Sequence, residues 1–188
     1  MKHDFLNSSE QSALKDWYDS LDHNRAVRAR LRRAEDPEDI LLTDAFFHFL
    51  NFMPEMFPKE LMENKWQFSE KQRFYVIASI AGLLSHVKQN NEISSFAKQL
   101  AGTGKDRAPM SELRFQQLLK SPNHTDFYRR MIRAIRLLNG SVNVISLAND
   151  VIQWFWEHEQ KESDRYPSNR LAVRWATDYF TALPKNID

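Results

Sequence analysis

The sequence contains no cysteine and only four glycines among its 188 residues. The lack of cysteine excludes disulfides, thiolate metal sites and cysteine nucleophiles. Scarce glycine disfavours all-β folds, because such folds need many tight turns. No run of about 18 apolar residues exists, so no membrane-spanning helix is expected. Residues 1–17 also lack the apolar stretch of a signal peptide, and we therefore expect a soluble, cytoplasmic protein.

Apolar residues recur at spacings of three and four along much of the chain, which predicts amphipathic helices. Leu14, Trp17, Tyr18 and Leu21 form one such stripe. The stretch RFYVIASIAGLLSHV, residues 73–87, is apolar on nearly every side and predicts a central helix. We therefore predict an all-α fold.

A turn rich in glycine and proline, AGTGKDRAP, lies near the middle of the chain. It divides the sequence into two stretches of predicted helices. We expect two consecutive small helical bundles, formed by residues 1–104 and 105–188. Residues 54–68 contain two prolines and several large apolar side chains, and predict an irregular loop pinned to the core.

Several short motifs predict where helices begin and end. Ser8 with Gln11, and Ser69 with Gln72, have the spacing of a capping box. Asp36 followed by Pro37 predicts the end of one helix, and Asn139 followed by Gly140 predicts the end of another.

The stretch RAVRARLRR, residues 25–33, has five arginines in nine residues, although the whole chain has a formal net charge of only +1. On a helix, Arg25, Arg28 and Arg32 share one face, Arg33 lies close to it and Arg30 points elsewhere. The cluster fits a phosphate-binding face, because the planar guanidinium bonds two phosphate oxygens at once. It equally fits a solvated face neutralised by the acids that follow it, which are Glu35, Asp36, Glu38 and Asp39.

A second cluster, RRMIRAIR, places Arg129, Arg133 and Arg136 at spacings of four and three, with Arg130 beside them. No acid occurs between Tyr128 and Asn149, so this helix cannot neutralise its own charge. Arg114 and Lys120 lie on the preceding predicted helix, and an antiparallel hairpin would bring them to the same surface. These residues add to the candidate nucleic-acid-binding set.

No catalytic constellation emerges from the remaining residues. The GTGK sequence lacks the spacing of a phosphate-binding P-loop. The six histidines are scattered, so neither a metal site nor a cofactor is expected. His48 and His86 are typical of satisfied core histidines, and Trp154 and Trp175 of core aromatics. A nuclease built on the acids at positions 35–39 is disfavoured, because nothing predicts that other carboxylates converge on them.

Four motifs in this order resemble one known family. They are RARLRR at residues 28–33, SELRFQQLL at 111–119, FYRRMIRAIRLL at 127–138 and VISLANDVIQW at 144–154. Together they resemble the small subunit, CasB, of the type I-E CRISPR Cascade surveillance complex, and the resemblance covers nearly the whole chain. It implies a helical, non-enzymatic subunit, present in two copies, whose basic surfaces hold opened DNA.

By motif, the resemblance assigns nucleic-acid contacts to Arg32, Arg33, Lys120, Arg129 and Arg130. Arg28, Arg114, Arg133 and Arg136 join this set from their predicted helical facing alone.

We therefore expect a subunit that binds nucleic acid without sequence preference and stabilises the R-loop between crRNA and target in antiviral defence. Its expected partners are crRNA, target DNA, the backbone and large subunits of Cascade, and a second copy of itself. The alternative is a helical interaction module whose arginines bind an acidic protein partner.

Overall fold

A computed structural model describes residues 5–52, 68–102, 107–160 and 166–184. The first half of the chain forms α1 (Ser8–His23), α2 (Arg25–Arg33), α3 (Pro37–Leu41), α4 (Asp44–Phe52) and α6 (Glu70–Ser85). The second half forms α8 (Glu112–Leu119), α9 (His124–Leu137), α10 (Val144–Gln160), the 3-10 helix η1 (Pro167–Asn169) and α11 (Leu171–Ala182). Between the halves lies the short helix α7 (Phe96–Ala101).

Helices account for nearly all regular structure in the described residues, which confirms the predicted all-α class. The exception is a pair of two-residue strands, β1 (Gln89–Asn90) and β2 (Ser141–Val142), which pair in parallel. They follow α6 and α9 respectively. The pairing therefore fixes the register between the ends of these two helices.

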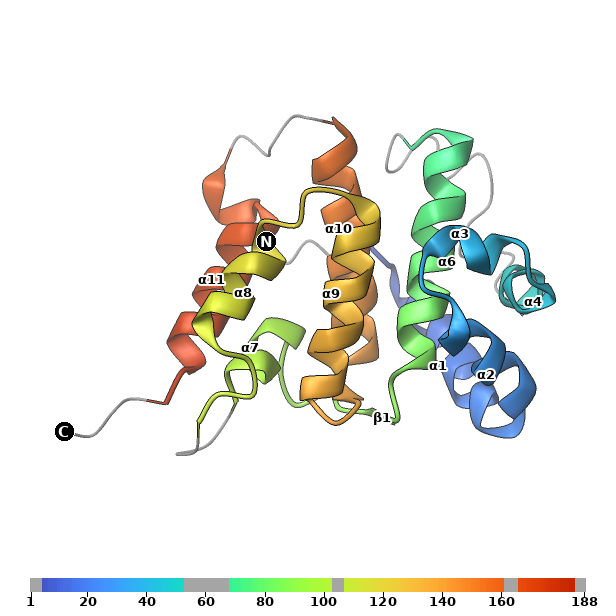
Figure 1. The fold of residues 1–188 in the computed structure, drawn as a ribbon, viewed down its shortest axis with the longest axis horizontal. Helices are drawn as coiled ribbons and strands as arrows, with labels where there is room; N and C mark the ends of the chain where they lie inside the picture. Colours follow the sequence, from blue (N-terminus) through green and yellow to red (C-terminus); the bar gives the residue numbers. More distant parts are fainter. Residues whose placement is uncertain (1–4, 53–67, 103–106, 161–165, 185–188) are drawn as a thin grey trace.

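Helix α6 occupies the middle of the molecule, between α1–α4 on one side and α9 and α10 on the other (Figure 1). Residues 76–87, which cover its last turns and the residues just beyond, are all buried. A helix surrounded by partners must be apolar all round, and this confirms the prediction made for residues 73–87.

The buried apolar side chains form one contiguous core that draws on both halves of the chain. Helix α7 comes directly after the first half in sequence but packs on α11. The predicted bundle boundary at residues 104 and 105 lies outside the described residues, as do residues 54–67 of the predicted loop, while Phe68 is buried. The division into two bundles stays a prediction.

Most helix ends agree with their sequence motifs. Ser69 and Gln72 form the predicted capping box of α6. Asn139 and Gly140 adopt positive φ angles of 55° and 79° and end α9, as predicted. The first capping box was wrongly placed, because Asn7 and Glu10 form it one residue earlier than Ser8 and Gln11.

The prediction for Asp36 and Pro37 was wrong as well. Helix α2 already ends at Arg33. Asp36 instead forms the N-cap of α3 and Pro37 is the first residue of that helix. Proline suits a first helical position because the N–H that it lacks has no intrahelical partner there.

Candidate nucleic-acid interface

Both arginine-rich helices pack on α6 and expose most of their arginines. Helix α2 buries Leu31. Helix α9 buries a full stripe made of Phe127, Tyr128, Met131, Ile132, Ala134 and Ile135. Since the arginines occupy the other sides of these helices, burial of the stripes directs the charge to the surface.

The start of α9 lies against the linker between α2 and α3. The Arg129 Nε donates a hydrogen bond of 3.4 Å to the Glu35 carbonyl oxygen. The Thr125 hydroxyl donates to the Asp36 carboxylate. Helices about a hundred positions apart in sequence are thus joined at this point.

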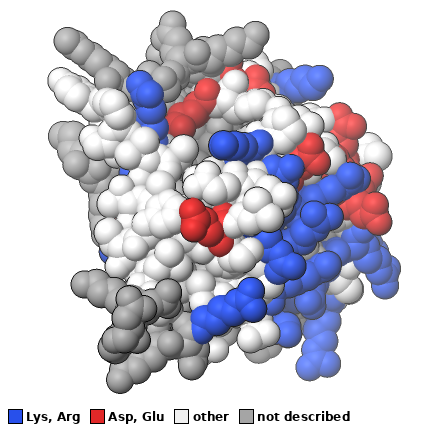
Figure 2. Space-filling model, turned by 60° about the vertical axis from the view of Figure 1, so that its left-hand side comes forward, with Lys and Arg blue, Asp and Glu red and all other residues white. Residues whose placement is uncertain are grey.

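Both helices pack on α6, which ends just before His86. This residue is buried, and its pKa is lowered to about 4 by burial and by the charges of Arg32 and Arg136. Arg32 belongs to α2 and Arg136 to α9, so charges from both helices act on the pKa of His86. Figure 2 shows Lys and Arg side chains gathered on one side of the molecule.

We call this surface the arginine face and define it by five exposed residues, Arg32, Arg33, Arg129, Arg133 and Arg136. Within the described part of the chain, no hydrogen bond or ion pair is made by the side chains of Arg32, Arg33, Arg133 and Arg136. Four guanidinium groups on one surface therefore remain available to an anion. Arg25, at the start of α2, is also exposed.

Arg28 is held inside the protein, with only 16% of its side chain exposed. It forms a 2.6 Å ion pair with Asp22 and donates a 3.4 Å hydrogen bond to the Val87 carbonyl oxygen. Its guanidinium also lies 5.6 Å from the ring centre of Tyr18. These contacts attach α2 to α1 and to the end of α6.

Arg30 and Arg130 are engaged by neighbouring elements too. Arg30 forms an ion pair with Asp44 at the start of α4, and this hydrogen bond lowers the pKa of Asp44. Arg130 donates to the Gln117 carbonyl oxygen near the end of α8 and lies 3.5 Å from the Ser121 hydroxyl. A cation suits that position, because it satisfies carbonyls at a helix C-terminus.

Arg114 on α8 and Lys120 at its C-cap are exposed. Arg114 lines a shallow hollow with Arg107 and Leu113. Within the described residues, no contact joins Arg114 or Lys120 to the arginine face.

The acids that follow α2 do not neutralise its arginines. Asp36 and Asp39 cap α3, and Glu38 accepts a hydrogen bond from the Tyr75 hydroxyl. Among the described residues none of these acids, nor Glu35, forms an ion pair with an arginine of α2. The acids that do pair with α2 are Asp22 and Asp44.

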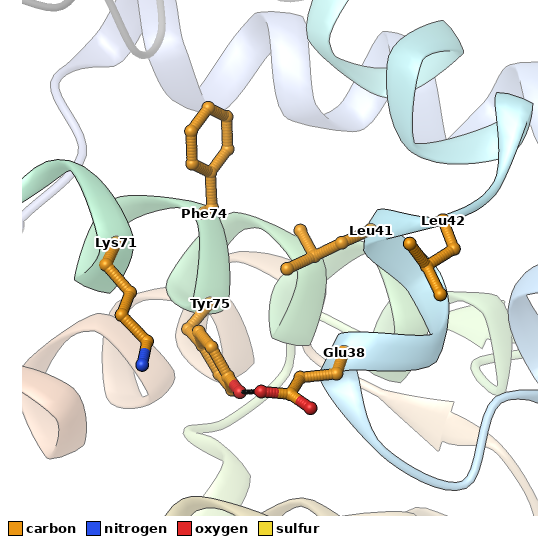
Figure 3. Close-up of a pocket in the computed structure, with 6 residues that line it drawn as sticks. All are labelled: Glu38, Leu41, Leu42, Lys71, Phe74 and Tyr75. Carbon is orange, nitrogen blue, oxygen red and sulfur yellow. Dashed lines mark hydrogen bonds between the residues drawn. The ribbon is translucent and has the colours of Figure 1, made fainter.

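The sequence pattern missed an apolar hollow beside α3 and the start of α6. Leu41, Leu42, Phe74 and Tyr75 line it, with Lys71 and Glu38 at its rim (Figure 3). Leu42 is 89% exposed and Phe47 on α4 is 57% exposed. No periodic pattern marks Leu42, because it is the C-cap of a helix of only five residues.

The core histidine prediction holds for the burial of His86 but not for its hydrogen bonding, and His48 is only half-buried. His86 is 6% exposed, and within the described residues its Nε2 has no hydrogen-bond partner. Trp154 and Trp175 are buried, as predicted.

The described residues contain no group of three or more metal-ligating side chains placed to hold an ion. None of their helices has the length and apolarity needed to cross a membrane.

Comparison with known proteins agrees with the resemblance inferred from the motifs. Residues 27–180 match the family of the CRISPR-associated protein Cse2, and this span includes α9 and nearly all of α2. No curated protein and no solved structure gives a match. The chain belongs to the Cse2 (CasB) family, whose members are structural subunits of the type I-E CRISPR Cascade complex.

Proposed function

We propose that this Cascade subunit binds nucleic acid without sequence preference through the arginine face, and so stabilises the R-loop between crRNA and target in antiviral defence. One observation carries the proposal. Arginines from two helices distant in sequence converge on one surface, and four of them have no partner among the described residues.

The chemistry of the arginine face suits a sugar–phosphate backbone. Guanidinium groups bond phosphate oxygens in pairs, and such contacts carry no base information. Exchange of a DNA duplex for an RNA–DNA hybrid is nearly balanced in free energy, as known for a related effector. A few backbone contacts by a non-catalytic subunit are then enough to favour the opened state.

Among the residues expected to bind nucleic acid, the geometry favours some over others. Arg32, Arg33, Arg133 and Arg136 are exposed and free, and we place them in direct contact with phosphates. Arg129 lies on the same face with a single weak hydrogen bond to a carbonyl oxygen. Arg114 and Lys120 form a second, separate contact region on α8.

Arg28 and Arg130 have a structural role in this proposal. Their contacts hold α2 to α1 and α9 to α8. We propose that they position the arginine face and do not touch the strand.

We further propose crRNA, target DNA, the backbone and large subunits of Cascade and a second copy of this chain as its partners in the cytoplasm. The exposed apolar residues Leu42, Phe47 and Phe74 support contacts with other proteins. Exposed large apolar groups lying together are typical of protein interfaces.

Equilibrium binding of the full chain to DNA at several salt concentrations tests the proposal. Single-stranded and duplex DNA of unrelated sequences should bind with similar affinity within each class. The logarithm of the association constant should fall linearly with the logarithm of salt concentration, by about 0.9 per duplex phosphate contacted and about 0.7 on single strands. Salt-independent binding, or strong preference for one sequence, would contradict it.

The same protein tests the alternative function, an interaction module for an acidic protein partner. If DNA does not bind, and an acidic protein stays bound after nuclease treatment, the arginine face serves a protein and the proposal is wrong.

A further inference from the structure

A wide polar hollow lies among α1, α7, α10 and α11, and none of the residues assigned to nucleic acid lines it. Its volume is about 820 Å³, within the range of binding clefts in proteins. None of its lining residues belongs to α2 or α9. The arginine face therefore gives this hollow no role, and its own chemistry indicates what it binds.

The charged side chains that line the hollow form three ion pairs, each between one cation and one acid. These pairs are Lys15 with Glu92, Lys98 with Asp178, and Arg174 with Asp150, at 2.5, 3.6 and 3.3 Å respectively. Because each cation is matched by an acid, a polyanionic nucleic acid gains little attraction there.

Much of the uncharged lining consists of amide and hydroxyl side chains. Within the described residues, the Oε1 atom of Gln11 and the hydroxyl groups of Ser94 and Ser168 have no hydrogen-bond partner. Such groups pair readily with the N–H and C=O groups of a polypeptide main chain. None of the described lining residues is aromatic, so an unpaired nucleobase finds no ring on which to stack.

Two aliphatic side chains of the hollow are exposed, Ile93 by 87% and Val173 by 38%. Protein interfaces combine apolar contacts with hydrogen bonds, and this lining offers both. A site for a small apolar molecule would instead be lined mainly by apolar and aromatic side chains. The hollow therefore suits a polypeptide better than a nucleic acid or a small apolar molecule.

We infer that this hollow binds an extended, uncharged polypeptide segment of a different subunit of the Cascade complex. Its amide and hydroxyl groups bond the main chain of that segment, while Ile93 and Val173 contact aliphatic side chains of the segment. An uncharged segment fits because the charged side chains of the hollow already pair with one another. The inference rests on the protein partners in the proposed function but not on the arginine face.

Binding of the full chain to the other subunits of its Cascade complex, purified together with crRNA, tests this docking site. Thr177 lines the hollow on α11, and its exposed side chain bonds only the Val173 carbonyl oxygen of the same helix. Thr177→Trp should therefore fold, yet weaken that binding by at least about tenfold, because the indole occupies the place of the segment. Biolayer interferometry measures the affinity, and a value equal to that of the wild type would overturn the inference.

Thr181→Trp provides the matched control. Thr181 is exposed one turn further along α11, and its hydroxyl also donates to a carbonyl oxygen of that helix, but it does not line the hollow. This variant should bind the other subunits like the wild type, and an equal loss in both variants would overturn the inference. Both variants should keep the helix content and the DNA affinity of the wild type, which checks that neither is misfolded.

Crosslinking gives a second test that leaves the hollow open. Because the chain has no cysteine, Ile93→Cys provides a single thiol at the hollow for a maleimide–benzophenone crosslinker. In the assembled complex, irradiation should join this position to a different protein subunit. A crosslink to a second copy of the chain, to crRNA or to DNA, or no crosslink at all, would contradict the inference.

DNA binding by the isolated chain separates failure of this inference from failure of the proposed function. If Thr177→Trp binds the other subunits normally while the wild type binds DNA in a salt-sensitive way, only the inference is wrong. If the wild type binds neither DNA nor the other subunits, the proposed function is wrong as well.

Discussion

Helices α2 and α9 are both rich in arginine, yet they differ in how many of their arginines form ion pairs with acids. Helix α2 has five arginines, of which Arg28 and Arg30 form ion pairs with Asp22 and Asp44. Helix α9 has four, and among the described residues neither Arg129 nor Arg130 pairs with an acid; both donate to backbone carbonyl oxygens. Within the described part of the chain, no ion pair compensates the arginines of α9, while those of α2 are partly neutralised.

The arginines of these helices have two different roles, which the sequence pattern alone does not distinguish. Arginines that point toward neighbouring helices join elements of the fold. Arginines on the outer side have no partner among the described residues, and one from each helix, Arg32 and Arg136, acts on the pKa of His86. Helix position, and not local arginine density, decides which guanidinium groups remain available to a phosphate.

The largest expected effect comes from breaking the contact that seats α9 on α6. A Cβ at Gly82 would collide with the Tyr128 hydroxyl and with Ile40 Cδ1. Gly82→Ala should therefore lower the free energy of unfolding by about 3 kcal/mol, as overpacking of a core does. Chemical denaturation monitored by circular dichroism measures this change.

A second substitution provides the control for that experiment. The Tyr128 hydroxyl is buried and has no hydrogen-bond partner in the described residues, so Tyr128→Phe alone should change stability little. Combined with Gly82→Ala it should restore part of the lost stability. If Gly82→Ala leaves stability unchanged, the close approach of α6 and α9 is wrong.

The next largest effect concerns the uncompensated charge of α9. The double variant Arg133→Glu, Arg136→Glu should weaken binding of single-stranded DNA by at least about tenfold per arginine, because each charge-assisted hydrogen bond contributes about 1.5–3 kcal/mol. Fluorescence anisotropy measures the affinity. Helix content and thermal stability should stay unchanged, since both side chains are exposed.

Lys71→Glu controls for the change in net charge. Lys71 is exposed at the opposite end of α6 from His86. Loss of affinity in Lys71→Glu as large as that per residue in α9 would mean that only overall charge matters.

The smallest effect concerns α2 itself, where it distinguishes an arginine that joins helices from an arginine that is exposed. Arg28→Gln should cost about 1–2 kcal/mol of stability, because it removes a part-buried ion pair and a hydrogen bond, and should barely change DNA affinity. Arg32→Gln should do the reverse. Thermal denaturation and anisotropy on both variants check this crossed pattern, and equal effects of the two changes on DNA affinity would refute it.

The elements of the fold that depend on local chemistry could be predicted from the sequence. The all-round apolar character of residues 73–87 indicated a central helix, and Ser69 with Gln72 marked where it begins. Asn139 and Gly140 ended α9 because both tolerate positive φ angles.

The division of the arginines could not be predicted in the same way. Arg28 and Arg130 are held in part by the carbonyl oxygens of Val87 and Gln117, and backbone oxygens leave no mark on a sequence. Asp44 lies fourteen positions after Arg30, beyond any helical spacing. The shared effect of Arg32 and Arg136 on the pKa of His86 depends on the packing of α2 and α9 on α6, which only the folded chain defines.

The most direct test of the central claim, that α2 and α9 form one phosphate-binding surface, is the salt dependence of single-stranded DNA binding. Wild type should be compared with Arg32→Gln, Arg136→Gln and the double variant. Each single substitution should make the slope of log affinity against log salt shallower by about 0.7, and the double variant by about 1.4. A slope that changes with only one of the two arginines, or with neither, would contradict the claim.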